Sequence, residues 1–118
     1  MESYDIIAVG GGPAGSSASM TAARAGLKVL MVEKRAEIGS PKRCGEGLSK
    51  SALERMGLEV EGIWVCRTIL GASAYAPNGK KITVNYQGPE GYVIERKMFD
   101  KWLAKKAVEA GAKVLAKT

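Results

Sequence analysis

The sequence predicts an α/β fold built on a parallel sheet, and three observations support this prediction. A short apolar run is followed by a cluster of glycines, a segment rich in alanine and serine, and a second apolar run. This order is typical of a strand–turn–helix–strand unit. A further strand-like segment follows a second amphipathic helix near the end of the chain. Strands that alternate with helices form parallel sheets, because each helix carries the chain back across the sheet.

The first βαβ unit is expected at residues 4–34. Its first strand, at 5–9, is a continuous apolar run, which is typical of a strand buried on both faces. A helix at 16–25 follows, with small side chains that suit close packing on a sheet and Gly26 as its C-terminal cap. The second strand is expected at 28–33. The crossover between two such strands is right-handed in nearly all proteins.

The middle of the chain has a different character. Residues 35–49 are rich in glycine and proline and are expected to form a long loop. A short helix is expected at 49–56, where Ser51 and Glu54 have the spacing of a capping box. Residues 66–95 then form a β-rich insertion.

Three strands are expected within this insertion, at 68–75, 81–86 and 92–95. Asn78-Gly79 lies between the first two, and this dipeptide is a strong signal for a β-hairpin. A helix with one apolar stripe is expected at 97–110 and a third parallel strand at 113–116. The predicted fold is therefore a Rossmann-like domain of three layers around a parallel sheet, with an inserted antiparallel hairpin or meander.

Composition excludes several classes of protein. The 118 residues include 18 Lys and Arg, 12 Asp and Glu, and no His, which excludes Ser-His-Asp triads and His-ligated metals. Cys44 and Cys66 are too few for a zinc site or a disulfide framework, so we expect no metal and a reducing, cytoplasmic setting. No apolar run approaches the roughly 20 residues of a membrane-spanning helix, and no signal-peptide pattern is present.

A glycine-rich turn joins the first strand to the first helix with the spacing Gly10-x-Gly12-x-x-Gly15. Gly10 permits the tight turn, Gly12 lets a pyrophosphate approach the backbone, and Gly15 lets the helix pack close to the strand. The N–H groups and the positive dipole at the start of the helix attract phosphate. The motif predicts a dinucleotide-binding site.

Glu33 strengthens this prediction, because an acid at the end of the second strand accepts hydrogen bonds from a ribose. A carboxylate there would also repel a 2′-phosphate, which argues against NADP. The alternatives are a glycine-rich turn that only joins strand to helix and an ordinary solvated acid.

The loop at 41–49 carries unusual chemistry. Gly45 and Gly47 flank Glu46 and would present backbone N–H groups at close range, while Arg43 would pair with a phosphate and favour a thiolate at Cys44. From spacing alone, a solvated turn with incidental charge is an equal alternative.

Three stretches of the sequence carry a family resemblance: residues 4–15, residues 32–35, and residues 38–49, which contain the segment Cys-Gly-Glu-Gly-Leu-Ser. Together they resemble the geranylgeranyl reductase family of flavoproteins, in particular the archaeal digeranylgeranylglycerophospholipid reductases. Residues 91–103 resemble a stretch that flavoproteins of the aromatic-hydroxylase type share.

The resemblance implies that FAD binds non-covalently along the βαβ unit. Ala14 and Gly15 would lie in the pyrophosphate turn, and Glu33 would bind the adenosine ribose. Arg96 would lie near the cofactor phosphates, a role that suits the planar fork of a guanidinium. A surface charge at the start of a helix is the alternative for Arg96.

In the same family the loop with Cys44, Gly45 and Gly47 contacts FAD. The implied reaction is reduction of the CH–CH double bonds of geranylgeranyl chains on archaeal ether phospholipids by reduced flavin. The prenylated lipid is the substrate, and an electron donor that the sequence does not identify supplies the electrons. Cys44 is the candidate for a proton donor or redox partner, and no other catalytic residue is assigned.

The chain is shorter than such a reductase, so we expect the N-terminal part of a larger enzyme, without a substrate domain and incomplete for catalysis. Another FAD-dependent oxidoreductase of the aromatic-hydroxylase architecture and a non-catalytic dinucleotide-binding module are the alternatives.

Charge adds a further expectation. The helix at 97–110 carries Lys97, Lys101, Lys105 and Lys106 on one side. Peripheral contact with an anionic membrane would explain this stripe, and a solvated helix face is the alternative. Nucleic-acid binding is not expected, because no recognition motif accompanies the net charge of +6.

Overall fold

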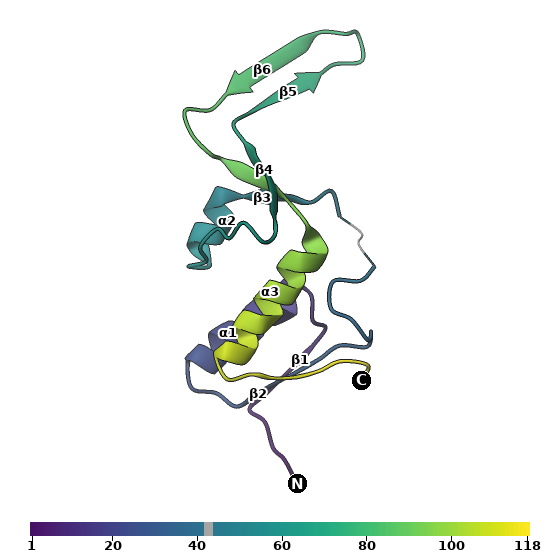
Figure 1. Ribbon diagram of the computed structural model, residues 1–118, viewed down its shortest axis with the longest axis vertical. Coiled ribbons are helices and arrows are strands. Elements are labelled where there is room, and N and C mark those ends of the chain that lie inside the picture. The colour runs from purple at the N-terminus through teal and green to yellow at the C-terminus, as the bar shows by residue number, and fades with distance from the viewer. Residues whose placement is uncertain (42–43) are drawn as a thin grey trace. The chain divides into compact units, whose positions relative to one another are not determined.

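The computed structural model of the chain describes residues 1–41 and 44–118. These residues divide into two units, of which the first consists of residues 1–41 and Arg96–Thr118 and the second of Cys44–Glu95. Figure 1 labels most of their helices and strands.

The first unit contains a parallel sheet of three strands in the order β1 (Ile6–Val9), β2 (Val29–Val32), β8 (Lys113–Leu115). Val9 pairs with Val32, and Val32 pairs with Leu115, so the carboxyl ends of all three strands meet at one edge. Ligands of open α/β sheets bind at this edge.

Two helices cover one face of this sheet. α1 (Pro13–Arg24) packs on β1 and β2, and α3 (Arg96–Glu109) packs on α1 and β8. Figure 1 shows the two helices side by side on the same side of the strands. The apolar stripe predicted for the helix at 97–110 forms the buried face of α3, which includes Phe99, Trp102, Leu103 and Ala107.

β1 is more exposed than its sequence predicts. Ile7 is 59% exposed and Val9 86%, whereas Val29 and Met31 of the neighbouring strand are almost fully buried. The prediction of burial on both faces is wrong for β1, because it is an edge strand of this sheet and, among residues 1–41 and 96–118, its main contacts are with β2 and α1. The described residues thus supply two layers, and the third layer remains a prediction.

The second unit contains two antiparallel sheets. One has the order β3 (Gly47–Ser49), β7 (Gly91–Ile94), β4 (Val65–Ile69), and the other is a ribbon of β5 (Gly71–Tyr75) and β6 (Lys81–Asn85). The predicted hairpin is this ribbon, with Asn78-Gly79 in its turn. Trp64 and Leu53 are buried in the core of this unit.

The structure differs from the prediction made from the sequence in three places within this unit. The single strand predicted at 68–75 is two strands, because β4 pairs with β7 while β5 pairs with β6. The predicted loop at 35–49 ends in β3, which gains its strand geometry by pairing with β7. The cap of α2 (Lys50–Arg55) is Ser49 and not Ser51, because Ser49 Oγ accepts a hydrogen bond of 3.2 Å from the Ala52 N–H.

Cross-strand pairing gives the β5–β6 ribbon two different faces. On one face Ser73 and Thr83 share a hydroxyl hydrogen bond of 2.9 Å, and Lys81 lies over the Tyr75 ring. The other face carries Ala72, Ala74, Ile82 and Val84. Ile82 is 71% exposed. None of the helices in the described parts of the chain is both long enough and apolar enough to cross a bilayer.

Candidate cofactor-binding site

The glycine-rich turn ends at the start of α1, where Gly12 is the N-cap and Pro13 the first helical residue. No side chain caps this helix. The N–H groups of Ala14 and Gly15 belong to the first turn, which offers them no acceptor within the helix. The turn therefore presents unused backbone donors together with the positive end of the helix dipole.

Gly15 and Gly12 of this turn differ in whether contacts within the protein require glycine at that position. A Cβ on Gly15 would collide with the carbonyl oxygen of Gly10, so close packing of helix and strand demands glycine there. A Cβ on Gly12 would meet no atom within 4 Å, and its φ of −76° suits any residue. None of the described residues requires glycine at position 12, so there is open space beside it at the helix start.

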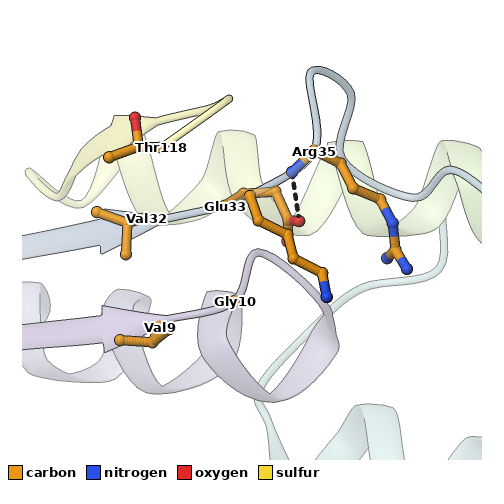
Figure 2. A pocket seen from close by; sticks show the side chains of 7 residues that line it. Val9, Gly10, Val32, Glu33, Arg35 and Thr118 are labelled. Atoms are coloured by element: carbon orange, nitrogen blue, oxygen red, sulfur yellow. Dashed lines mark hydrogen bonds between the residues drawn. The ribbon is translucent and has the colours of Figure 1, made fainter.

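The Glu33 carboxylate ties the end of β2 to the glycine-rich turn. Its Oε2 accepts a hydrogen bond of 2.8 Å from the Gly11 N–H, and its Oε1 accepts one of 2.9 Å from the Arg35 N–H. Figure 2 shows Glu33 beside Gly10 and the backbone of Arg35. Glu33 is only 8% exposed, so these two bonds fix the direction of a buried carboxylate.

The same two bonds hold this carboxylate in its charged form. The N–H of Arg35 and then that of Gly11 lower the pKa of Glu33 below its ordinary value, against the opposing effect of desolvation. Each carboxylate oxygen keeps further lone pairs, because an ionised carboxylate has about four acceptor sites. Glu33 is therefore a fixed, ionised acceptor that has capacity left for ribose hydroxyl groups.

A pocket of about 410 Å³ opens at the carboxyl ends of β1 and β2. Glu33 supplies its anionic wall, Val9 and Val32 supply apolar surface, and Lys34 and Arg35 supply cations. Gly10 and Thr118 complete the lining (Figure 2). An apolar wall beside a fixed carboxylate suits a base joined to a ribose.

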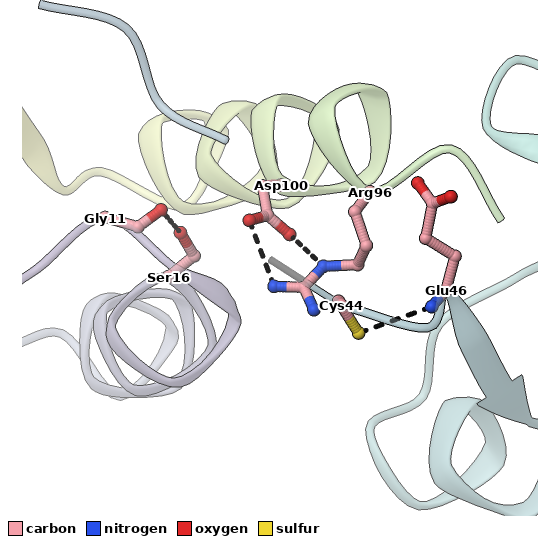
Figure 3. Close-up of polar contacts among 6 residues, drawn as sticks. All are labelled: Gly11, Ser16, Cys44, Glu46, Arg96 and Asp100. Carbon is pink, nitrogen blue, oxygen red and sulfur yellow. Dashed lines mark hydrogen bonds and ion pairs between the residues drawn. The ribbon is translucent and has the colours of Figure 1, made fainter. Parts of the chain in front are cut away.

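Arg96 begins α3, and its guanidinium forms two parallel hydrogen bonds with Asp100 one turn later. Nε lies 2.9 Å from Oδ1 and one terminal nitrogen lies 3.2 Å from Oδ2 (Figure 3). The Asp100 side chain is 8% exposed and that of Arg96 is 25% exposed. The i,i+4 spacing of the two residues was readable in the sequence, but the burial of the acid was not.

The lysines of α3 form ion pairs with nearby acidic side chains. Lys97 and Lys101 both bind Glu37, and Lys105 and Lys106 both lie near Glu109. The two lysine partners lower the pKa of Glu37. This pairing removes much of the mutual repulsion that the sequence alone indicates.

The loop with Cys44 belongs to the second unit. The exposed Cys44 Sγ accepts a hydrogen bond of 3.4 Å from the Glu46 N–H (Figure 3). The Glu46 carbonyl accepts one of 2.8 Å from the Ile94 N–H. A Cβ on Gly45 or Gly47 would meet no atom within 4 Å.

The structure brings together some of the predicted residues. Gly10, Gly12, Ala14, Gly15 and Glu33 gather at one edge of the sheet. Arg96 lies in the same unit, whereas Cys44, Gly45 and Gly47 lie in the other. Arg43 lies outside the described residues.

Sequence reasoning missed three contributions to this site. The N–H groups of Gly11 and Arg35 bind the Glu33 carboxylate, and Asp100 forms two hydrogen bonds with Arg96. Backbone donors carry no sequence signal, so the first two were not predictable. Among residues 1–41 and 44–118, no cluster of His, Cys, Asp and Glu has the arrangement of a metal site.

Comparison with known proteins agrees with this geometry. The sequence model of the FAD dependent oxidoreductase family matches residues 5–41, which include the glycine-rich turn and Glu33. Digeranylgeranylglycerophospholipid reductase 2 of Methanopyrus kandleri is 51% identical over 111 residues, or 94% of this chain. The corresponding reductase of Thermoplasma acidophilum is 48% identical and is matched by the whole chain. The predicted resemblance to the geranylgeranyl reductase family is confirmed. FAD is the cofactor that the family match supports.

The matched reductases are much longer than this chain, which spans 27% of the first and 31% of the second. A solved geranylgeranyl bacteriochlorophyll reductase-like structure from Thermoplasma acidophilum superposes with a TM-score of 0.95 at 48% identity, over 99% of this chain and 30% of that one. The FAD-dependent halogenase CndH superposes with a TM-score of 0.82 at 24% identity, over 99% of this chain and 29% of that one. At that identity it shows the shared fold alone, which is a mixed α/β fold of FAD-dependent oxidoreductases.

Proposed function

We propose that this chain forms the part of an FAD site that binds the adenosine and pyrophosphate, in a flavin-dependent reductase. The reductase saturates the geranylgeranyl double bonds of archaeal ether phospholipids. One observation carries the cofactor proposal: the ionised Glu33 is fixed beside a glycine-rich turn whose first helical N–H groups have no side-chain cap. The lipid substrate comes from the names of the matched reductases.

The residues present fit this cofactor. Ala14 and Gly15 offer N–H groups to the pyrophosphate, and Glu33 offers acceptors to the ribose hydroxyls. The open space beside Gly12 is where a Cβ would obstruct the phosphate. Arg96 adds a cationic fork for a phosphate oxygen, and Arg43 is proposed for the same role from the sequence alone.

FAD supplies the redox chemistry when it is bound. This chain's residues bind and orient the cofactor. Cys44 is proposed as the donor of the proton that the alkene takes up during its reduction, with Gly45 and Gly47 presenting their backbone to FAD. A separate electron donor reduces the flavin.

A three-layer Rossmann-like arrangement belongs to the same proposal, with a further layer on the open face of β1 and β2. Peripheral contact with an anionic membrane is proposed as well, because the substrate is a lipid and the chain carries a net charge of +6. The pairing of the α3 lysines with Glu37 and Glu109 weakens the case for α3 as the contact surface.

The experiment uses a full-length chimera, in which this chain replaces the matching 31% of the Thermoplasma acidophilum reductase. The chimera is purified, loaded with FAD, reduced with dithionite without oxygen, and mixed with digeranylgeranyl glycerophospholipid. We expect bound-flavin absorbance and saturated lipid by mass spectrometry. Cys44→Ser is expected to slow saturation without releasing FAD.

The outcomes separate the alternatives. Bound FAD without lipid reduction would favour another FAD-dependent oxidoreductase. A folded but colourless chimera would contradict the cofactor proposal and favour a non-catalytic module. Unchanged turnover of the Cys44→Ser variant would remove Cys44 from the mechanism.

A further inference from the structure

The β5–β6 ribbon carries exposed side chains that the proposed FAD site does not use. We propose that the tip of this ribbon, residues 74–82, binds the headgroup layer of an anionic phospholipid bilayer. The inference rests on the proposed function, because it names the surface that makes the peripheral membrane contact of the reductase. It replaces α3 as the candidate surface, since the lysines of α3 are paired with acids.

The backbone of the ribbon tip is fixed by its own hydrogen bonds. The Ala76 N–H donates to the Lys80 carbonyl at 2.8 Å, and the Gly79 N–H donates to the Ala76 carbonyl at 2.9 Å. The Lys80 N–H also donates to Asn78 Oδ1 at 3.1 Å. Gly79 has a φ of +83°, which glycine adopts without strain. The side chains on either side of the turn therefore start from a defined backbone.

Apolar and aromatic side chains are exposed at the ribbon tip. Tyr75 is 68% exposed and Ile82 71%. Among the described residues β5 and β6 pack mainly on each other, and Figure 1 shows the ribbon beyond β4 of the same unit. A pocket of about 560 Å³ at the tip is lined by Ala74, Tyr75, Ala76, Lys80, Lys81 and Ile82. An exposed apolar surface with a polar rim is typical of a site that binds protein or membrane.

The charge of this region has one sign. Residues 62–89 contain three cations, Arg67, Lys80 and Lys81, and no acid. Lys80 and Lys81 are exposed at the tip, and Lys81 Nζ lies 5.4 Å from the centroid of the Tyr75 ring. The ribbon tip thus places two cations beside an aromatic ring and an aliphatic side chain, without an acid in the same stretch of sequence.

This combination of groups suits the interface of a bilayer better than it suits another macromolecule. Tyrosine is enriched at membrane interfaces, and lysine keeps its charge among headgroups while its methylene groups contact apolar surface. Anionic lipids attract such lysines within a Debye length. A two-fold contact between copies of this chain would bring the same lysines together, and a nucleic acid would leave Ile82 without an apolar partner.

The test measures cosedimentation of the full-length chimera with vesicles of equal parts phosphatidylserine and phosphatidylcholine. These diacyl lipids carry no geranylgeranyl chain, so binding reports the surface and not the catalytic site. We expect binding to these vesicles and none to vesicles of phosphatidylcholine alone. Lys80→Gln combined with Lys81→Gln is expected to weaken binding about tenfold or more, because each lysine near an anionic surface contributes about fivefold.

Lys105→Gln combined with Lys106→Gln is the matched control, because it removes the same charge from two adjacent lysines of α3 that lie near Glu109. We expect this control to weaken binding less than about twofold, since salt screens charges that do not touch the bilayer. Tyr75→Ser is expected to weaken binding several-fold and Tyr75→Trp to preserve it, because both aromatic side chains favour the interface. The ribbon variants are expected to melt near the unmodified chimera, because the tip is exposed.

Four outcomes overturn the inference. Equal losses in the two lysine pairs would assign binding to net charge, and unchanged binding in the ribbon variants would remove the tip from the contact. A lower melting temperature of Tyr75→Ser would show that the rest of the reductase covers the tip. Binding of a single-stranded oligonucleotide without binding of vesicles would assign the tip to nucleic acid.

Reduction of digeranylgeranyl glycerophospholipid in detergent tests the proposed function separately. We expect Lys80→Gln combined with Lys81→Gln to keep this activity in detergent and to lose most of it on lipid held in anionic vesicles. Equal activity on vesicles with and without the two lysines contradicts the inference. Absence of activity in detergent for the unmodified chimera overturns the proposed function, whereas vesicle binding reports on the ribbon tip in either case.

Discussion

The glycine-rich turn of the first unit and the β5–β6 ribbon of the second are both short, yet different contacts hold them. The turn depends on a partner outside itself, because Glu33 binds the Gly11 N–H across 22 residues, and on close packing of Gly15 against the Gly10 carbonyl. The ribbon depends on contacts between its own strands, such as the bond between Ser73 and Thr83. The first region therefore has little tolerance for change, and the second has much.

This difference agrees with the role that we propose for the turn. A site that binds a ligand needs its donors and acceptors fixed before the ligand arrives, and tertiary contacts provide that rigidity. A ribbon that forms from a turn and its cross-strand pairs keeps its geometry without such support. The effects of substitutions on the free energy of unfolding should therefore differ in size and in cause between the two regions.

Gly15→Ala is expected to have the largest effect on stability. The added Cβ would collide with the Gly10 carbonyl, which is backbone and has no rotamer to change. We expect a loss of about 3 kcal/mol or more in the free energy of unfolding, measured by urea denaturation. Gly62→Ala is the control, because a Cβ there meets no atom within 4 Å. Equal stability of the two variants would contradict the packing argument.

Glu33→Gln is expected to cost about 2 kcal/mol, because two hydrogen bonds to a buried charged acceptor are weakened. The pKa of Glu33 is lowered in the folded protein from its ordinary value of 4.5, so its contribution to stability is fully present above that pH. That contribution is lost as the pH falls from there through the folded pKa.

Unfolding curves at pH 7 and at pH 3 measure this dependence. The difference between the unmodified protein and Glu33→Gln should shrink at the lower pH. A difference that stays constant between the two pH values would show that the charge of Glu33 does not contribute to stability.

Ile82→Thr on the ribbon is expected to have the smallest effect, within about 0.5 kcal/mol, because Ile82 is 71% exposed and threonine keeps the β-branched shape. Leu53→Ala in the same unit is the contrast, since Leu53 is 2% exposed and its loss should cost about 2–5 kcal/mol. A large loss in Ile82→Thr would mean that the ribbon depends on contacts outside itself.

Sequence periodicity and glycine spacing predicted the βαβ unit, the hairpin and helix α3, because these features depend on local residues. They did not predict the exposure of β1, which depends on what covers a sheet face and not on the strand itself. They also missed β3, since three residues become a strand only through pairing with β7.

The candidate site divides in the same way. The glycine positions and Glu33 were readable from spacing, because each has a defined role in a phosphate-binding turn. The hydrogen bonds from Gly11 and Arg35 that hold Glu33 could not be read from the sequence, because both donors are backbone N–H groups. Arg96 was identified through the family resemblance, and its buried partner Asp100 emerged only from the packing of α3.

The most direct test of the cofactor site is the affinity of a Gly12→Ser variant of the full-length chimera for FAD. Serine is a preferred N-cap, the backbone of Gly12 accommodates it, and its Cβ meets no protein atom within 4 Å. Its side chain would nevertheless occupy the space of the pyrophosphate and engage the N–H groups of the first turn. We predict an unchanged or higher melting temperature and at least a tenfold weaker affinity, about 1.4 kcal/mol, with Gly62→Ser as the control. Unchanged affinity for FAD in Gly12→Ser would contradict the proposed site.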